Sequence, residues 1–271
     1  MVNYVKAVIL GLVQGLTEFL PVSSSGHLVL AERLLGIQLP GVTFEVFLHV
    51  GTLLSVVWVF RQRLFAIIKS FLALFTRDQL ARLAGREDRR FGLLLIAASV
   101  PTALIAFGLG DVVERAFGST LFVGIALTIT GGLLWLADSL PGGKKGISET
   151  TTLDALLIGV FQGIAIFPGI SRSGATISGA LFRQMDKKKA AEFSFLLSIP
   201  AIVGGGLVEA LDIGAGLAEM DWLFYLLGIV AAAGAGIFAI RFFIKLLIKN
   251  KLRPFAIYCW AAGVLAVITS L

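Results

Sequence analysis

Apolar residues fill long runs of this chain from one end to the other, and polar residues are confined to short stretches between the runs. A run of about 17 to 25 mostly apolar residues is long enough for an α-helix to cross the hydrocarbon core of a bilayer. Six runs have that length, and each predicts a membrane-spanning helix. They cover residues 43–60, 91–110, 118–138, 190–211, 221–240 and 254–271.

Two further apolar regions, residues 5–35 and 153–183, are interrupted midway by clusters of Pro, Ser and Gly. Each interruption leaves two half-length helices, which are too short to cross the membrane singly. Segments of this kind usually enter and leave the membrane by one face. We therefore predict a re-entrant helical hairpin in each region.

The composition is that of a membrane protein, because 57% hydrophobic and 15% charged residues cannot fold around one water-soluble core. No change in composition marks a soluble domain, so we expect one membrane domain over residues 1–271. Lys6 alone flanks the first apolar stretch and no small-residue cleavage site follows, so a removable signal peptide is not expected. The single cysteine, Cys259, excludes intrachain disulfides.

Basic residues gather in four of the polar stretches. Residues 61–90 hold eight, 139–152 two, 183–189 four and 241–253 five, together 19 of the 23 in the chain. Because cytoplasmic loops collect Lys and Arg, we expect these stretches to face the cytoplasm and both termini to lie on the opposite side. The net charge of +6 then indicates topology and contact with anionic lipid headgroups, and nucleic acid is not an expected partner.

The two interrupted regions match each other without a gap when Gly11 is aligned with Gly159. The identical positions are Gly11, Gln14, Gly15, Phe19, Ser23, Ser25 and Gly26 in the first region and Gly159, Gln162, Gly163, Phe167, Ser171, Ser173 and Gly174 in the second. The same shift pairs Phe47 and Leu48 with Phe195 and Leu196. We interpret this match as a duplication, with repeat 1 in residues 1–140 and repeat 2 in residues 153–271.

Each repeat would comprise one re-entrant hairpin and three spans, and an odd number of crossings turns the second repeat upside down. The predicted fold is therefore an all-α integral membrane protein of two inverted-topology repeats, with six full spans. Inverted repeats with broken helices bring their unwound tips together near the bilayer midplane, where helix N-termini offer N–H groups to an anion. The repeat thus predicts an anion site.

The first tip carries several side chains suited to chemistry. Gln14 and Glu18 are four residues apart on one helix face, and a carboxylate at membrane depth requires a partner or a cavity. Pro21 ends that half-helix. The polar cluster after it is Ser23, Ser24, Ser25, Gly26 and His27. Its hydroxyls can cap the next half-helix, and its glycine lets a ligand approach the backbone.

The second tip repeats the Ser-x-Ser-Gly core as Ser171, Ser173 and Gly174, followed by Thr176, but it has Arg172 at the centre. The planar guanidinium group can bind phosphate oxygens through two parallel hydrogen bonds, a geometry that Lys does not reproduce. A carboxylate, an imidazole, several hydroxyls and a guanidinium group are therefore expected at one point.

Each feature also has a purely structural interpretation. Ser and Gly favour tight helix packing in membranes, Glu18 could form a structural ion pair with Arg172, and His27 could cap a helix. Their predicted convergence favours a functional site over these separate structural roles. We interpret His49 as structural, because no repeat or break supports it, and Glu45 and Glu192 as capping or interfacial residues.

These motifs resemble those of the bacterial undecaprenyl-diphosphate phosphatases, integral membrane enzymes associated with bacitracin resistance. The resemblance covers essentially the whole chain. It rests on Glu/Gln-x-x-x-Glu from Gln14 to Glu18, Pro-Val-Ser-Ser-x-Gly-His ending at His27, and Pro-Gly-x-Ser-Arg-Ser-x-x-Thr ending at Thr176. It implies hydrolysis of a C55 isoprenoid diphosphate to the monophosphate and inorganic phosphate, which recycles the lipid carrier of peptidoglycan synthesis.

The resemblance further implies the bacterial cell membrane, a site on the periplasmic side and a divalent cation, Mg²⁺ or Ca²⁺. Glu18 would hold the cation, with the amide oxygen of Gln14 as a weaker ligand than a second carboxylate. We expect Arg172 to clamp the diphosphate, and either Ser24, with His27 as base or acid, or His27 itself to attack. The expected diphosphate-binding residues are Ser23, Ser25, Gly26, Ser171, Ser173, Gly174 and Thr176.

Inverted repeats with broken helices are also the architecture of secondary transporters, so transport or flipping of a polyprenyl phosphate lipid is the alternative function. A channel is disfavoured because no span carries regularly placed polar residues. The expected partners are the lipid diphosphate and membrane lipids, and a homodimer is compatible with the sequence.

Overall fold

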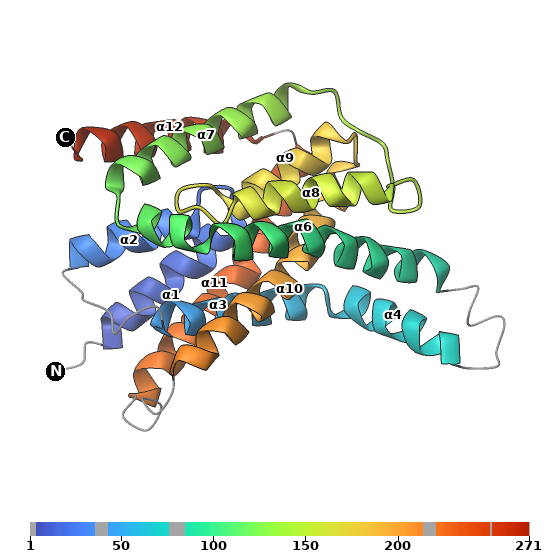
Figure 1. Cartoon of the computed structure of the whole chain (residues 1–271), viewed down its shortest axis with the longest axis horizontal. Coiled ribbons are helices and arrows are strands. Elements are labelled where there is room, and N and C mark those ends of the chain that lie inside the picture. Colours follow the sequence, from blue (N-terminus) through green and yellow to red (C-terminus); the bar gives the residue numbers. More distant parts are fainter. Residues whose placement is uncertain (1–3, 36–42, 76–84, 214–220, 250, 271) are drawn as a thin grey trace.

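Each apolar run folds into an α-helix, and the helices end at the Gly-, Pro- or charge-rich segments between the runs (Figure 1). The computed structural model describes residues 4–35, 43–75, 85–213, 221–249 and 251–270. Leu271, at the end of the last predicted span, lies outside these described residues. So do Arg77 and Arg82, two of the basic residues on which the topology prediction rests. The helices are α1 Tyr4–Phe19, α2 Ser24–Leu35, α3 Thr43–Val59, α4 Arg61–Leu72, the 3-10 helix η1 Ala73–Phe75, α6 Arg86–Phe117, α7 Thr120–Ser139, α8 Thr152–Ile164, α9 Arg172–Phe182, α10 Lys187–Ile213, α11 Trp222–Ile248 and α12 Arg253–Ile268.

All six runs predicted to span the membrane are helical, but not all are long enough to cross it alone. Within the residues that the structure describes, four helices have the length and apolar character for a crossing, namely α6, α7, α10 and α11. A fifth candidate is the pair α3 and α4, which is bent by 77°. The last helix, α12, has 16 residues and is shorter than these. The chain is therefore a multi-pass helical membrane protein by length and composition.

The helix α4 occupies part of a stretch that the charge pattern predicted as a cytoplasmic loop. Its apolar positions Leu64, Ile67, Ile68 and Phe71 follow the spacing of an amphipathic helix, a signal that the many basic residues obscured. Ile67 and Phe71 pack against Gly92 at the start of α6. A residue larger than glycine at this position would require these two side chains to shift. Three basic residues of this stretch, Arg61, Arg63 and Lys69, therefore lie on a folded helix.

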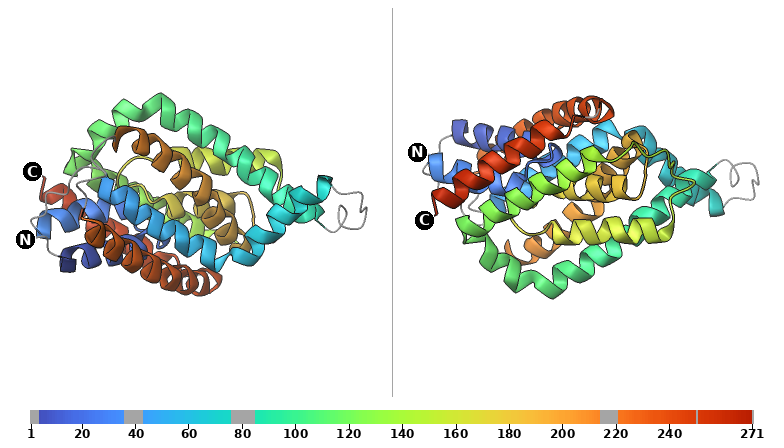
Figure 2. Two further views of the ribbon diagram at one scale, coloured as in Figure 1. Left: turned by 90° about the horizontal axis from the view of Figure 1, so that it is seen from below. Right: turned by 90° about the horizontal axis from the view of Figure 1, so that it is seen from above.

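The two predicted hairpins are present, with their breaks at residues 20–23 and 165–171. Helices α1 and α2 form the first hairpin, and α8 and α9 form the second. Figure 1 shows them entering from opposite ends of the molecule, with their tips meeting near its middle. Both views of Figure 2 place the start of α1 and the end of α12 at one end of the molecule and the far end of α4 at the other.

Each hairpin packs against a helix from the other half of the sequence. A Cβ added to Gly11 of α1 would overlap the carbonyl oxygen of Gly228 in α11, and a Cβ added to Gly159 of α8 would overlap that of Ala98 in α6. Because Gly11 and Gly159 are matched positions of the repeat, both halves use the same glycine for the same close contact. The Thr102 hydroxyl adds a hydrogen bond of 2.9 Å to the Gly159 carbonyl.

The variant Gly159→Ala is expected to destabilise the protein by about 2 kcal/mol, because the new methyl group must push α8 away from the α6 backbone. The matched control is Gly234→Ala on α11, where nothing lies within 4 Å of the added carbon. That variant should unfold at or slightly above the wild-type temperature, since alanine favours helix. Thermal unfolding in detergent compares the two, and an equal loss in both would contradict this packing.

The base of the second hairpin is held by a buried carboxylate. Asp154 is fully buried at the start of α8, where its side chain accepts the backbone N–H of Thr151 in a capping box. It also pairs with Lys145 at 3.2 Å and with Arg183, at the end of α9, at 2.6 Å. The ion pair ties the beginning of α8 to the end of α9, so the position of the tip between them is fixed.

Candidate active site

The first tip is a tight reversal of the chain between α1 and α2. Ser23 has a positive φ of 69°, a conformation that a non-glycine residue adopts at a cost of about 1 kcal/mol or more. Its hydroxyl accepts the backbone N–H of Gly26 at 3.4 Å, and its carbonyl accepts that of His27. Ser23 therefore caps α2 and directs the next residue, Ser24, back toward the end of α1.

Glu18 is the centre of the site. Its side chain is 5% exposed, and Arg172 of the second tip donates to its Oε1 oxygen. The Oε2 oxygen accepts the hydroxyl of Ser24 at 2.5 Å and the side-chain amide of Gln14 at 3.1 Å. Four of the predicted site residues, from both halves of the sequence, thus form one hydrogen-bonded group.

The second tip is held in place by its own hydroxyl groups. Ser171 caps α9 by accepting the Gly174 N–H at 3.1 Å, and Ser173 donates to the Leu20 carbonyl of the first tip at 3.3 Å. Thr176 is fully buried and shares a 2.6 Å hydrogen bond with Ser194 of α10. These three side chains were expected to bind phosphate oxygens. In the structure each has a hydrogen-bond partner in the protein: Ser171 within the second tip, Ser173 in the first tip and Thr176 in α10.

The threonine of α7, Thr130, supports the same tip. Its hydroxyl donates to the Gly169 carbonyl and accepts the Ser171 N–H, both at 3.1 Å. Gly169 has a φ of +94°, and a Cβ there would lie 2.5 Å from the Val123 carbonyl oxygen, so only glycine fits this turn. The sequence analysis did not identify Thr130, because it lies in an apolar run with no break or repeat to mark it.

Two buried polar atoms of the central group have no hydrogen-bond partner among the described residues. They are Nη1 of Arg172 and Oε1 of Gln14. A buried, unpaired N–H donor is stabilised by an anionic oxygen, and a buried, unpaired amide oxygen by a cation or a donor. Arg172 is therefore only partly neutralised by Glu18 and keeps a nitrogen for a ligand.

Among the described residues no hydrogen bond joins His27 to Ser24, the two side chains that were expected to act together. Its Nδ1 lies 2.7 Å from the Ser23 carbonyl oxygen, and its Nε2 lies 2.5 Å from the hydroxyl of Tyr258 in α12. The hydroxyl of Ser24 faces Glu18 instead. Ser24 and His27 are three residues apart in α2 and lie on the same side of that helix, and their partners differ because Glu18 and Tyr258 approach α2 from different helices.

His49 lies beside the site, whereas the sequence favoured a structural role away from it. Its Nε2 is 3.8 Å from Oε2 of Glu18, and its Nδ1 is 2.8 Å from the Glu45 carbonyl oxygen. Packing of α3 against α11 and α10 brings it there, and no local pattern around His49 signals this. Glu192 pairs with Arg63 at 3.2 Å and with Lys189 at 3.0 Å, in agreement with an interfacial position.

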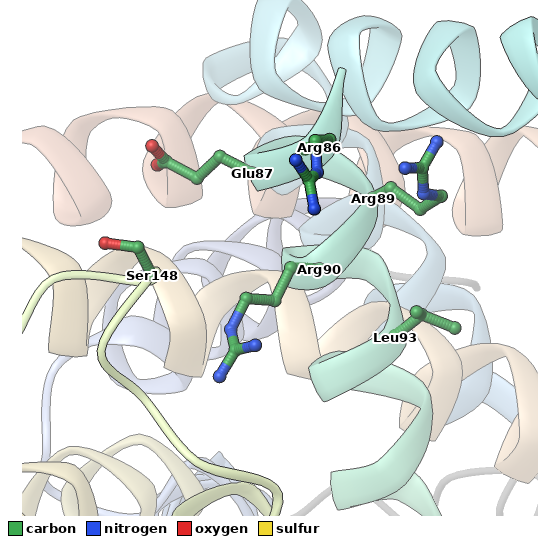
Figure 3. Close-up of a pocket in the computed structure, with 6 residues that line it drawn as sticks. All are labelled: Arg86, Glu87, Arg89, Arg90, Leu93 and Ser148. Carbon is green, nitrogen blue, oxygen red and sulfur yellow. The ribbon is translucent and has the colours of Figure 1, made fainter. Parts of the chain in front are cut away.

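The electrostatic character of the tips favours an anion. The N-termini of α2 and α9 both begin at the tips, and each contributes a partial positive charge and backbone N–H groups. Arg172, although paired with Glu18, adds the unpartnered N–H group of Nη1 next to them. The surface pocket in Figure 3 lies elsewhere, at the start of α6, and none of the predicted site residues lines it. Its lining is Arg86, Glu87, Arg89, Arg90, Leu93 and Ser148.

The fold and the site together define a multi-pass helical membrane protein in which two hairpin tips bring together a carboxylate, a guanidinium group and several hydroxyls. The family model described as Bacitracin resistance protein BacA matches residues 7–265, and the chain belongs to that family. The undecaprenyl-diphosphatase of Alkaliphilus metalliredigens is 44% identical over 271 residues, covering 98% of each chain. That of Carboxydothermus hydrogenoformans is 45% identical, covering 97% of this chain and 95% of its own. An undecaprenyl-diphosphatase from Methanosphaera stadtmanae is 38% identical across 100% of this chain and 99% of its own.

Proposed function

We propose that this protein is an undecaprenyl-diphosphatase, which hydrolyses undecaprenyl diphosphate to undecaprenyl phosphate and inorganic phosphate. Family membership and the names of the relatives support the activity. The observation in the structure that carries it is the group formed by Arg172, Glu18 and Ser24. It unites an anion clamp with a hydroxyl that is hydrogen-bonded to a carboxylate. This recycling of the lipid carrier supports peptidoglycan synthesis and accounts for bacitracin resistance.

The clamp would act on the terminal phosphoryl group. The unpaired Nη1 of Arg172 and the N-termini of α2 and α9 would bind its oxygens and offset the negative charge that grows on them during transfer. Glu18 holds the guanidinium group of Arg172 in place through Nη2. Positioning by these fixed groups supplies most of the catalysis that phosphoryl transfer requires.

Ser24 is the better supported nucleophile. Its Oγ would form a bond to the terminal phosphorus while its proton passes to Oε2 of Glu18, which already accepts it at 2.5 Å. The bond from that phosphorus to the bridging oxygen breaks, and undecaprenyl phosphate leaves with the electron pair. Water then hydrolyses the phosphoserine, and inorganic phosphate is released. His27, the other candidate, faces Tyr258 instead of this group.

A divalent cation would be held by the oxygen donors of Gln14 and Glu18, in exchange for part of the hydrogen bonds that Glu18 accepts from Arg172, Ser24 and the Gln14 amide. The amide oxygen of Gln14 is buried without a partner, and Mg²⁺ commonly binds through one or two protein oxygens together with substrate phosphates. Among the described residues no group of three His, Cys, Asp or Glu could hold a metal ion by itself. When bound, the cation would neutralise phosphate charge and polarise the reacting phosphoryl group.

The variant Gln14→Glu is expected to raise the affinity for Mg²⁺, because it replaces a neutral oxygen ligand by a second carboxylate beside Glu18. Without Mg²⁺ the two carboxylates repel each other, so its unfolding temperature should fall below that of the wild type and rise on adding the ion. The control is Gln162→Glu, at the matched position of the second hairpin, which should show no extra response to Mg²⁺. An equal response in both variants would contradict a cation at Gln14.

The finer topology is part of the proposal. We infer six crossings in two inverted repeats, which is supported by the matched contacts of Gly11 and Gly159 and by the opposed hairpins of Figure 1. We place both termini and the site on the extracytoplasmic side of the bacterial cell membrane, because the basic stretches concentrate on the other side. Cysteine labelling from outside intact cells tests the orientation.

Size-exclusion chromatography with light scattering in detergent tests for a homodimer.

The experiment that tests the function is a phosphate-release assay on the purified protein with undecaprenyl diphosphate, with and without a chelator. We expect release that depends on the divalent cation. Binding of the lipid without any release would instead favour transport or flipping of the lipid, the alternative suggested by the broken-helix architecture.

A further inference from the structure

His27 is held on both sides of its ring, and one of the two partners comes from the far end of the sequence. Nδ1 lies 2.7 Å from the Ser23 carbonyl oxygen, and Nε2 lies 2.5 Å from Oη of Tyr258. The two rings also stack, with 5.6 Å between their centroids and 15° between their planes. This tyrosine has no counterpart in the motifs of the two tips.

The partners of His27 determine where its proton lies. A carbonyl oxygen can only accept a hydrogen bond, so Nδ1 carries the hydrogen that faces Ser23. In the neutral imidazole, Nε2 then has the lone pair, and the Tyr258 hydroxyl donates to it. Nε2 is therefore the only ring nitrogen of His27 that can take or transfer a proton, and Tyr258 fixes its direction.

Tyr258 is itself firmly placed by the packing of α12. The neighbouring Cys259 is fully buried with its Sγ 3.5 Å from the carbonyl oxygen of Pro21, so α12 contacts the first tip at two successive residues. On the other side of α12, the indole of Trp260 donates to the Thr128 carbonyl of α7 at 3.1 Å. Tyr258 is 47% exposed, and the pair that it forms with His27 lies at the rim of the tip.

We propose that Tyr258 is a positioning residue for His27, which holds the imidazole in its Nδ1–H form with Nε2 at the rim of the site. The inference rests on the proposed phosphatase function and adds a role for His27, whose Nε2 would take the proton from the water that hydrolyses the phosphoserine. It gives α12 a role in the reaction, although none of the recognised motifs lies on that helix. Partners that orient metal-bound histidines in this way contribute roughly 10- to 100-fold to metal affinity or activity, and we expect an effect of similar size for Tyr258.

A packing role and a substrate-binding role for Tyr258 make predictions that differ from those of a positioning role. If Tyr258 only packs against α2, its ring matters and its hydroxyl does not. If its hydroxyl binds the lipid phosphate directly, its loss should raise KM and should have an effect even without His27. A positioning role requires the hydroxyl, acts on kcat and disappears when His27 is absent.

The test is Tyr258→Phe, which keeps the stacked ring and removes only the hydroxyl. We expect kcat for phosphate release to fall about 10- to 100-fold with KM within about twofold of the wild type. In the His27→Gln background the same change should have no further effect, as a double-mutant cycle would measure. The matched control is Tyr225→Phe on α11, whose ring packs among Phe44, Phe47 and Trp222, and it should keep the wild-type kcat.

A readout independent of activity is the ¹⁵N NMR spectrum of protein labelled at histidine, where the signal absent from His27→Gln identifies His27. We expect a protonated Nδ1 and a hydrogen-bonded, unprotonated Nε2, and a changed Nε2 signal in Tyr258→Phe. An unchanged Nε2 signal, an unchanged kcat, a change confined to KM or a full additional effect in the His27→Gln background would each overturn the proposal. If the wild type releases no phosphate, the proposed function fails, and the spectrum still tests the His27–Tyr258 contact.

Discussion

Replacing Arg172 by lysine is expected to lower kcat by roughly 100- to 1,000-fold, although the positive charge is kept. In the guanidinium group, Nη2 donates to Glu18 and Nη1 is left to bind the substrate. A lysine ammonium group cannot make both contacts with the same geometry. Arg172→Ala removes the clamp altogether, and the expected loss is roughly 1,000-fold or more. Phosphate release from undecaprenyl diphosphate in detergent measures both.

The lysine variant is the more informative of the two because it separates geometry from folding. The alanine variant leaves Glu18 buried without its ion partner, which destabilises a protein by about 3 to 5 kcal/mol when the pair is fully buried. Lysine retains that partner, so its unfolding temperature should stay close to that of the wild type. Arg115→Lys, at an exposed position of α6, is the control and should be fully active. Near-normal turnover by Arg172→Lys would remove the clamp from the mechanism.

Ser24→Ala is expected to abolish turnover, with a loss of roughly 1,000-fold or more, because it removes the oxygen that attacks phosphorus. Ser25→Ala should lose only about fivefold, since the Ser25 hydroxyl lies 3.3 Å from that of Ser23 and makes no contact with Glu18 in the structure. Rapid quenching with substrate labelled in the terminal phosphate should trap a phosphoserine in the wild type. A label found on His27 would exclude Ser24 as the nucleophile.

The two serines were indistinguishable in the sequence, where they are adjacent members of one polar cluster. The conformation at Ser23 separates them, because its positive φ directs Ser24 toward α1 and leaves Ser25 beside Ser23. The turn that contains this φ thus brings the Ser24 hydroxyl, and not that of Ser25, within hydrogen-bond distance of the carboxylate. No residue pattern specifies it, since a positive φ is common for glycine and uncommon for serine.

Contacts between distant parts of the chain were predictable only where the repeat linked them. The duplication indicated that the tips carrying Glu18 and Arg172 meet, although these residues are 154 positions apart. It gave no information on Tyr258, which is 231 positions from His27 and lies in no repeated motif. For His49 the sequence favoured a structural role, and the packing of α3 places it beside Glu18.

The sequence by itself determined the membrane class, the helices in the long apolar runs and the two broken hairpins of this protein, but not the helix α4. These features follow from runs of apolar residues and from Pro and Gly, which act over a few neighbouring positions and need no tertiary contact. It also determined which chemical groups the tips carry. Only the tertiary structure decided which of those groups touch, because a hydrogen bond depends on distances within a few tenths of an ångström. Helix packing and the turn at Ser23 set those distances, so Ser24 faces Glu18 while His27 faces Tyr258.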